Sequence, residues 1–189
     1  MRDANMGRVL AQLARAAIAF RLNITAEYPE LNFDWLHQLG ASFVTLKRDG
    51  QLRGCIGSLE ARRNLVDDIQ ANAVAAAFED YRFSPLTSDE YLTLEIEVSV
   101  LSPLVPMSVR TEDEVISKLR RGIDGLVIEY GAHRATFLPQ VWEQLPDPQV
   151  FLAHLKNKAG LPADFWDPEM KLFTYQVHKY HEQEQFGHG

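Results

Sequence analysis

Residues 41–57 read Ala41-Ser-Phe-Val-Thr-Leu-Lys47, then Arg48-Asp-Gly-Gln51, then Leu52-Arg-Gly-Cys-Ile-Gly57. The first and last runs are typical of β-strands, and Asp49-Gly50 between them is a strong hairpin signal, because both positions of the tight turn favour positive φ. A hairpin pairs its strands antiparallel and needs no helical crossover. The segment therefore predicts an antiparallel sheet.

The residues on either side add helices and further strands. Apolar residues recur at helical spacing in residues 6–25 and 64–80, whereas Leu92–Leu101 alternates with the period of a strand. The second half predicts a helix after Thr111, strands at Leu126–Tyr130 and Arg134–Leu138, a helix from Pro148 and a last strand at Leu172–Tyr180. The order helix, strand, strand, helix, strand therefore occurs twice.

These patterns predict an α+β fold, with a mainly antiparallel sheet and flanking helices. The repeated order suggests an internal duplication that gives two lobes, in halves of about 6–101 and 111–180, within one domain that spans residues 1–189. We expect the halves to share one core, because so few strands in each half would not be stable alone. Residues 181–189 are polar and are expected to form a flexible tail.

Composition excludes several classes of protein. The 189 residues carry 19 basic and 26 acidic side chains, a net charge of −7, which argues against binding to nucleic acid. The single cysteine, Cys55, excludes an internal disulfide and favours a reducing compartment such as the cytoplasm. No apolar run approaches the roughly 18 residues of a membrane span. Charged and polar residues near the start argue against a signal peptide.

The hexapeptide Leu52–Gly57 is the densest candidate site. Strict strand alternation would place Arg53 and Cys55 on one face, about 7 Å apart, where a guanidinium can favour a reactive thiolate. Gly54 and Gly57 would mark a bulge or the close approach of a backbone or ligand. The alternative is that Cys55 is only a small, buried apolar side chain.

Other candidates lie outside the hexapeptide. Asp80 and Arg82 could pair with each other at a helix end or orient groups near the hexapeptide. Glu95 and Glu97 share one face of a strand and could divide acid and base roles, or simply face solvent. Gln140, beside Trp142, could grip a ligand unless the loop only packs the tryptophan into the core. No metal site and no cofactor are predicted.

The chain resembles the AMMECR family, whose bacterial and archaeal members are called AmmeMemoRadiSam system protein A. The hexapeptide Leu52–Gly57 is the family's hallmark, and the resemblance extends from about Arg8 to Tyr180. Other matching segments are Gly40–Leu46, Asp80–Leu86, Leu94–Leu101, Gly122–Gly125, Phe137–Val141 and Lys158–Leu161. The resemblance implies an intracellular, two-lobed α+β protein with the hexapeptide lining a cleft between the lobes. It also implies a genomic association with a radical S-adenosylmethionine enzyme and a Memo-like protein, but no established reaction.

Two functions are consistent with these residues. In the first, the chain is a binding component that works with the radical S-adenosylmethionine enzyme and the Memo-like protein, and the hexapeptide is a rigid wall of its site. In the second, it is an enzyme that uses Cys55 as a nucleophile or thiol carrier, with Arg53 as the partner of an anion or of the thiolate. An exposed strand edge would also allow two chains to pair as a homodimer.

Overall fold

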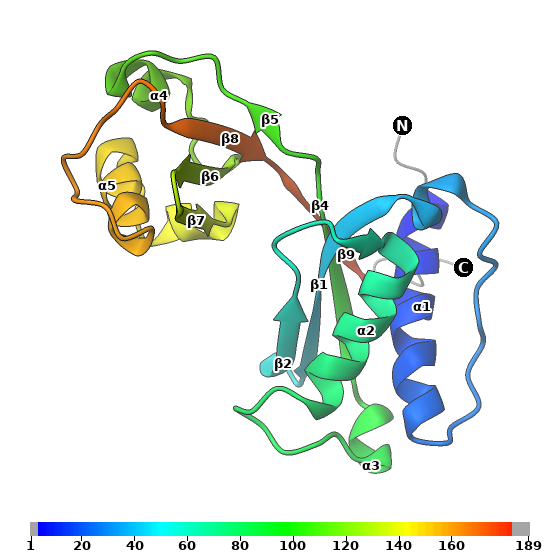
Figure 1. Cartoon of the computed structure of the whole chain (residues 1–189). Helices are drawn as coiled ribbons and strands as arrows, with labels where there is room; N and C mark the ends of the chain where they lie inside the picture. Colours follow the sequence, from blue (N-terminus) through cyan, green and yellow to red (C-terminus); the bar gives the residue numbers. More distant parts are fainter. Residues whose placement is uncertain (1–3, 183–189) are drawn as a thin grey trace. The chain divides into compact units, whose positions relative to one another are not determined.

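The computed structural model describes residues 4–182, which fold into two compact units (Figure 1). Unit 1 contains the residues up to Leu101 and those from His178, and unit 2 contains Ser102–Val177. Together they confirm the predicted α+β class. None of the helices within residues 4–182 is long and apolar enough to span a membrane.

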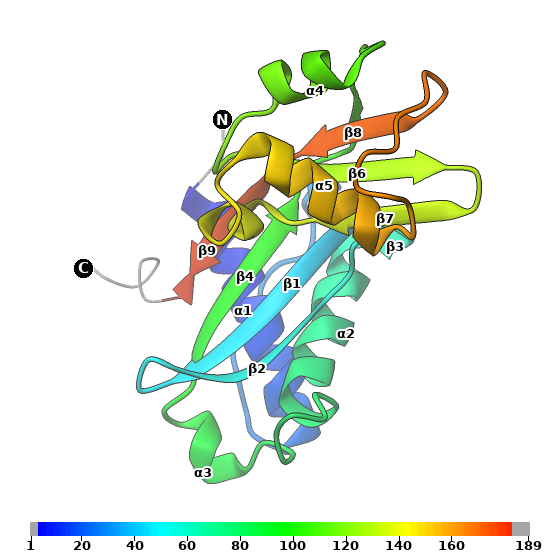
Figure 2. The same ribbon diagram turned by 90° about the vertical axis from the view of Figure 1, so that its left-hand side faces the viewer.

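Unit 1 is a sheet whose helices lie on one face. Its strands are β1 (Leu39–Arg48), β2 (Gln51–Gly57), the two-residue β3 (Arg63–Asn64), β4 (Glu95–Leu101) and β9 (Val177–His181), and the main order is β2-β1-β4-β9, with β3 on β1. Its helices are α1 (Ala4–Arg21), the 3-10 helix η1 (Asp34–His37), α2 (Leu65–Phe78) and the short α3 (Ser88–Tyr91). Figure 2 shows α1 and α2 behind this sheet, which leaves its other face, called here the outer face, without a helix of unit 1.

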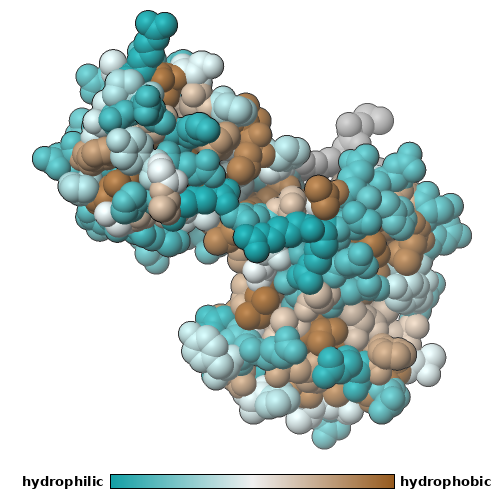
Figure 3. Space-filling model, in the orientation of Figure 1, coloured by the Kyte–Doolittle hydropathy of each residue, from teal (hydrophilic) through white to brown (hydrophobic). Residues whose placement is uncertain are grey.

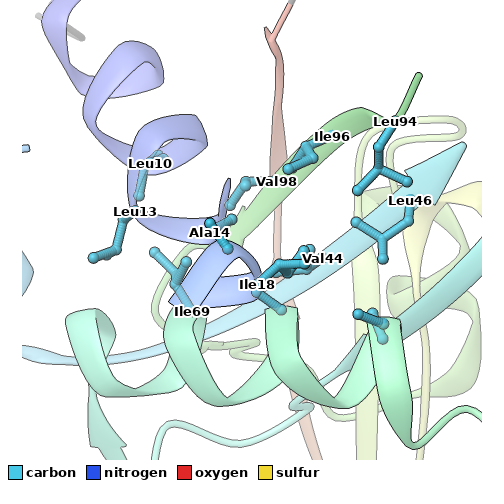
Figure 4. Close-up of a cluster of buried hydrophobic side chains, with 14 of the residues drawn as sticks. Leu10, Leu13, Ala14, Ile18, Val44, Leu46, Ile69, Leu94, Ile96 and Val98 are labelled. Atoms are coloured by element: carbon cyan, nitrogen blue, oxygen red, sulfur yellow. The ribbon is translucent and has the colours of Figure 1, made fainter. Parts of the chain in front are cut away.

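Apolar side chains fill the space between this sheet and its two long helices. Val44 and Leu46 of β1 point into this space, where Val44 lies beside Ile18 of α1 (Figure 4); Ile69 of α2 belongs to the same cluster. All four are fully buried. Because side chains alternate along a strand, the neighbours of these residues in β1 lie on the outer face.

Unit 2 has a second sheet and a core of its own. Its strands are β5 (Val105–Pro106), β6 (Gly125–Tyr130), β7 (His133–Phe137) and β8 (Lys171–Tyr175), in the order β5-β8-β6-β7. Its helices are α4 (Glu112–Lys118), the 3-10 helix η2 (Pro139–Glu143) and α5 (Pro148–Lys158). A cluster that includes Trp142 and Phe151 forms the core. Each unit thus has its own cluster, so the expectation of one shared core is wrong.

The strand-pairing order of unit 1 recurs in unit 2. In each sheet the first strand of a hairpin, β1 or β6, also pairs antiparallel with a third strand, β4 or β8. The fourth strand of the unit 1 sheet, β9, follows β8 of unit 2 along the chain. In the same way, the fourth strand of the unit 2 sheet, β5, follows β4 of unit 1. Each sheet therefore takes its fourth strand from the segment that follows a crossing of the chain between the units.

The sequence prediction for the last strand needs correction. The expected single strand at 172–180 is two strands, β8 and β9, which belong to different sheets and meet at Gln176. The backbone N–H of Gln176 donates to the Ser102 hydroxyl, and the Ser102 N–H donates to the Gln176 carbonyl, both at 2.8 Å. Of the predicted tail, His181 ends β9 and Glu182 binds Arg15, whereas residues 183–189 lie outside the described residues.

Candidate functional site

The hairpin that carries the hexapeptide turns as predicted, but β2 contains a bulge. Asp49 and Gly50 both have positive φ, 52° and 76°, as the tight turn requires. Leu46 pairs with Gly54 and Lys47 with Leu52, so Arg53 is an extra residue in β2. The prediction that strict alternation places Arg53 and Cys55 on one face is therefore wrong.

The buried Arg53 forms an ion pair with the partly buried Glu90 of α3. Its Nε and Nη2 donate to the two Glu90 carboxylate oxygens at 2.8 and 3.2 Å, and Nη2 also donates to the Ser84 carbonyl at 2.7 Å. Arg48 donates to the same carboxylate at 3.1 Å. The hydrogen bonds from Arg53 lower the pKa of Glu90 to about 2, against the effect of burial. These contacts fix the position of the Arg53 guanidinium within unit 1.

Asp80 and Arg82 clamp the backbone of Cys55. The carboxylate of Asp80, which is 4% exposed, accepts the Cys55 N–H at 3.0 Å, and Arg82 Nη2 donates to the Cys55 carbonyl at 3.4 Å. Arg82 also binds Asp80 through Nη2 at 2.7 Å and Nε at 3.0 Å. Asp80 and Arg82 thus both pair with each other and orient the hexapeptide. Hydrogen bonds from Arg82 hold the pKa of Asp80 well below its usual range.

This clamp also satisfies the free edge of the sheet. β2 is an edge strand, and such a strand exposes backbone groups that can pair with another chain. At Cys55 a carboxylate accepts the outward N–H and a guanidinium donates to the outward carbonyl. The Asp80–Arg82 pair therefore takes the place of a neighbouring strand at this residue.

The two glycines of the hexapeptide are needed for packing. A Cβ on Gly54 would lie 2.1 Å from the carbonyl oxygen of Ala76, so the missing side chain allows α2 to approach β2. A Cβ on Gly57 would lie 2.1 Å from the ring of Phe43, its partner across the hairpin. Gly54 therefore faces a helix backbone, whereas Gly57 also lines a pocket described below.

Four polar side chains form a row across the outer face of unit 1. Cys55 lies opposite Thr45, and Thr45 lies opposite Glu97 on the next strand. The Cys55 sulfur lies 3.2 Å from the Thr45 hydroxyl, and His181 Nδ1 lies 3.1 Å from a Glu97 carboxylate oxygen. A thiol, a hydroxyl, a carboxylate and an imidazole thus follow one another across β2, β1, β4 and β9. Cys55 is partly exposed, so it is not the fully buried side chain of the alternative prediction.

A small cavity of about 80 Å³ lies at the histidine end of this row. Glu95, Glu97 and His181 line it together with Lys47, whose Nζ lies 3.8 Å from Glu97. The two glutamates predicted as an acid and base pair thus share one cavity. Only Glu97 belongs to the row that begins at Cys55.

A larger, polar pocket of about 560 Å³ begins where the hexapeptide ends. It is lined by Gly57, Ser58, Leu59, Glu60, Arg62, Arg63 and Asp68. Asp68 is buried, accepts hydrogen bonds from Ser42 and Ser58, and forms an ion pair with Arg63 at 2.8 Å. Arg62 is highly exposed and binds only its near neighbour Glu60 in the part of the chain that the structure describes. The pocket therefore combines a buried, hydrogen-bonded carboxylate, Asp68, with an exposed guanidinium, Arg62.

Gln140 belongs to unit 2, whereas the residues described above belong to unit 1. It is exposed on η2 of unit 2, and the neighbouring Trp142 packs into the unit 2 core and donates its indole N–H to the Asp124 carbonyl at 2.7 Å. The structure thus gives Trp142 the packing role that the sequence offered as the alternative to a ligand-binding loop.

Comparisons with known proteins agree with this fold. A sequence model of the AMMECR1 family matches residues 11–180. This chain belongs to the AMMECR1 family. A protein of Methanothermobacter thermautotrophicus is 39% identical over 180 residues, which cover 93% of this chain and 94% of that protein. One from Methanocaldococcus jannaschii is 36% identical over 189 residues, with 96% and 92% covered. The crystal structure of an uncharacterized protein from Pyrococcus horikoshii matches with a TM-score of 0.73 and 34% identity, over 95% of this chain and 92% of that one.

The match to the AMMECR1 family spans both units, but sequence reasoning missed several residues of the candidate site. Glu90 could have been found, because Thr87-Ser-Asp-Glu90 has the spacing of a capping box, which the structure contains. Thr45 and His181 carry no local signal, since only strand register brings them into the row with Cys55. Asp68 also carries no local signal of its role, because its hydrogen-bond partners Ser42 and Ser58 lie in other segments.

Proposed function

We propose that this AMMECR1-family chain is a binding component that works in the cytoplasm with a radical S-adenosylmethionine enzyme and a Memo-like protein. The resemblance to the AMMECR family supports these partners. The observation that supports binding is the polar pocket at Gly57, whose volume is in the range of small-ligand sites, about 300–1,000 Å³. The hexapeptide acts as a fixed wall, because Arg53, Gly54 and the Cys55 backbone are already held by Glu90, α2 and Asp80.

The pocket suits an anionic group of a ligand or partner. A guanidinium binds carboxylate or phosphate through two parallel hydrogen bonds. The Arg62–Glu60 pair is exposed and so contributes little, about 0–1 kcal/mol, which makes its exchange for another anion inexpensive. Arg63 is held by the buried Asp68 and positions the pocket wall.

Co-purification tests this proposal. The chain should retain the radical S-adenosylmethionine enzyme or the Memo-like protein of the same genome. Arg62→Gln should weaken that binding by about 10- to 100-fold, the equivalent of one charge-assisted hydrogen bond. Arg8→Gln, which removes an exposed arginine from α1, is the matched control and should bind normally, as should Cys55→Ser. If the wild-type chain retains neither protein, or Arg62→Gln binds as well as Arg8→Gln, the proposal fails.

The row on the outer face supports a second candidate, an enzyme that uses Cys55. The partly exposed sulfur lies beside the Thr45 hydroxyl, and a thiol is activated as a nucleophile when a cation or base favours the thiolate. Arg53 was the expected cation, and its guanidinium binds Glu90. The guanidinium of Arg82 also binds a carboxylate, that of Asp80, but it contacts the Cys55 carbonyl as well. Arg82 is therefore the better candidate for the partner of the thiolate.

Alkylation of Cys55 by iodoacetamide, followed by intact mass against pH, separates the two functions. A nucleophilic Cys55 should react at pH 7, and Arg82→Gln should slow that reaction. Arg48→Gln is the control, because it removes a nearby guanidinium that binds Glu90. A folded chain that does not react at pH 7 excludes the thiol mechanism and leaves the binding function unaffected.

A further inference from the structure

A second pocket in unit 1, of about 520 Å³, lies between the two long helices and the loop that follows α1. It is lined mostly by apolar residues of α1, the loop and α2: Ala16, Ala17, Phe20, Ile24, Ala26 and Val74. Its polar lining consists of Arg21, Thr25, Tyr28 and Gln70. In the space-filling view, brown and tan residues gather over the part of unit 1 where α1 and α2 lie (Figure 3).

The end of α1 shapes this pocket. Asn23 has a positive φ of 57°, the Ile24 N–H donates to the Ala19 carbonyl at 2.9 Å, and the Asn23 N–H donates to the Phe20 carbonyl at 3.2 Å. These are the two hydrogen bonds of a Schellman motif, which turns the chain back along the helix. Gln70 of α2 then donates to the hydroxyl of Tyr28 and ties the loop to the second helix. The pocket is thus a built concave site.

Two lining residues are exposed in a way that packing does not explain. Phe20 is 81% exposed, although it lies next to buried residues of α1. Arg21, in the last turn of the same helix, contacts the ring of Phe78 at 5.3 Å and has no carboxylate partner among the described residues. An apolar surface with one unneutralised cation at its edge complements a molecule with an apolar body and one negative charge.

We propose that this pocket binds a small amphipathic carboxylate, with its hydrocarbon part against Phe20, Ile24 and Val74 and its carboxylate on Arg21. The site is separate from the polar pocket at Gly57 and does not depend on the function proposed there. A small molecule fits better than a protein partner, because the loop and the Tyr28–Gln70 hydrogen bond close the site into a concavity. Binding buries apolar surface, so it should show a negative heat-capacity change.

Calorimetric titration of the purified full-length chain tests the proposal. It compares the affinity for decanoate, kept below its micelle-forming concentration, with the affinity for 1-decanol, which has no charge. Decanoate should bind more tightly than decanol. Arg21→Gln should lower the affinity for decanoate by at least about tenfold, which corresponds to 1.4 kcal/mol, and leave decanol unchanged. Because Arg21 is exposed, this variant should fold normally.

A filled pocket provides the second arm. Ala17→Trp should abolish binding of both probes, whereas Ala132→Trp, at an exposed turn of unit 2, should bind as the wild type does. Phe20→Ala should weaken both probes and keep the fold, because the ring is exposed. Absence of decanoate binding, or equal affinity in Arg21→Gln, overturns the proposal. The proposal is also overturned if the wild-type chain is a dimer that does not bind decanoate and Phe20→Ala makes it monomeric. In that case a second copy of the chain occupies the pocket.

Discussion

Replacing Asp80 by asparagine tests the clamp on Cys55. The carboxylate accepts the Cys55 N–H at 3.0 Å and two N–H groups of Arg82 at 2.7 and 3.0 Å. Asparagine keeps one acceptor oxygen but loses the charge. A hydrogen bond to a charged group contributes about 1.5–3 kcal/mol, and the Arg82 side chain is 45% exposed, so solvent screens part of its share. We therefore expect the free energy of unfolding to fall by about 2 kcal/mol.

Urea denaturation over a range of pH measures this loss. Hydrogen bonds from Arg82 lower the pKa of Asp80 in the folded chain, so the unfolded chain binds more protons in acid. The contribution of the carboxylate is then fully present above the unfolded-state pKa of about 3.9 and is lost as the pH falls toward the lower folded-state value. The difference between wild type and Asp80→Asn should stay constant from pH 7 to about 5 and shrink in stronger acid.

Asp67→Asn is the control for the loss of one negative charge from unit 1. Asp67 is exposed in the first turn of α2, where its interaction with the helix dipole contributes only about 0.3–1 kcal/mol. The clamp would be refuted if Asp80→Asn lost no more stability than Asp67→Asn. It would also be refuted if the difference from wild type did not change between pH 5 and the acid limit of folding.

Two further predictions concern the hexapeptide. Glu90→Gln should lower the free energy of unfolding by about 2–3 kcal/mol, because it leaves the buried Arg53 without a charged partner. Urea denaturation measures this loss. The difference from wild type should diminish as the pH falls from about 4.3 toward the Glu90 pKa of about 2. Gly54→Ala should lower the free energy of unfolding far more than Gly50→Ala in the same assay. The Cβ of alanine at position 54 would lie 2.1 Å from the Ala76 carbonyl oxygen, whereas position 50, at φ 76°, has open space and a substitution there strains only the backbone. Equal losses in the two glycine variants would show that α2 can move away from β2.

Local patterns were sufficient to predict the hairpin and the order of the longer helices and of the main strands up to β7. Asp49-Gly50 fixes the turn through the φ preferences of two adjacent residues, and this information is entirely local. The prediction was wrong where the strand pattern continues although the chain passes from one sheet to the other. Residues 172–180 keep strand character throughout, yet the chain leaves one sheet and enters the other at Gln176. Leu92 fits the alternation of β4 but is 78% exposed, because the preceding residues form α3.

The candidate site was less predictable than the fold, because its contacts join distant segments. Arg53 meets Glu90, 37 residues later in the chain, and strand periodicity contains no information about that pairing. The bulge at Arg53 has the same cause. It is a feature of the register between β2 and β1, which the alternation of six residues does not encode.

The structure changes how the hexapeptide should be interpreted. Its arginine and first glycine are explained by an ion pair and a close helix contact, so their presence needs no catalytic role. Two parts of the motif remain available for function, namely Cys55, a partly exposed residue on the outer face, and the Gly57 end at the polar pocket. These two parts lie within three residues of each other on one strand, which Asp80 holds through its backbone. A variant at Asp80 should therefore disturb both parts, whereas Cys55→Ser and Arg62→Gln should each affect only one of them.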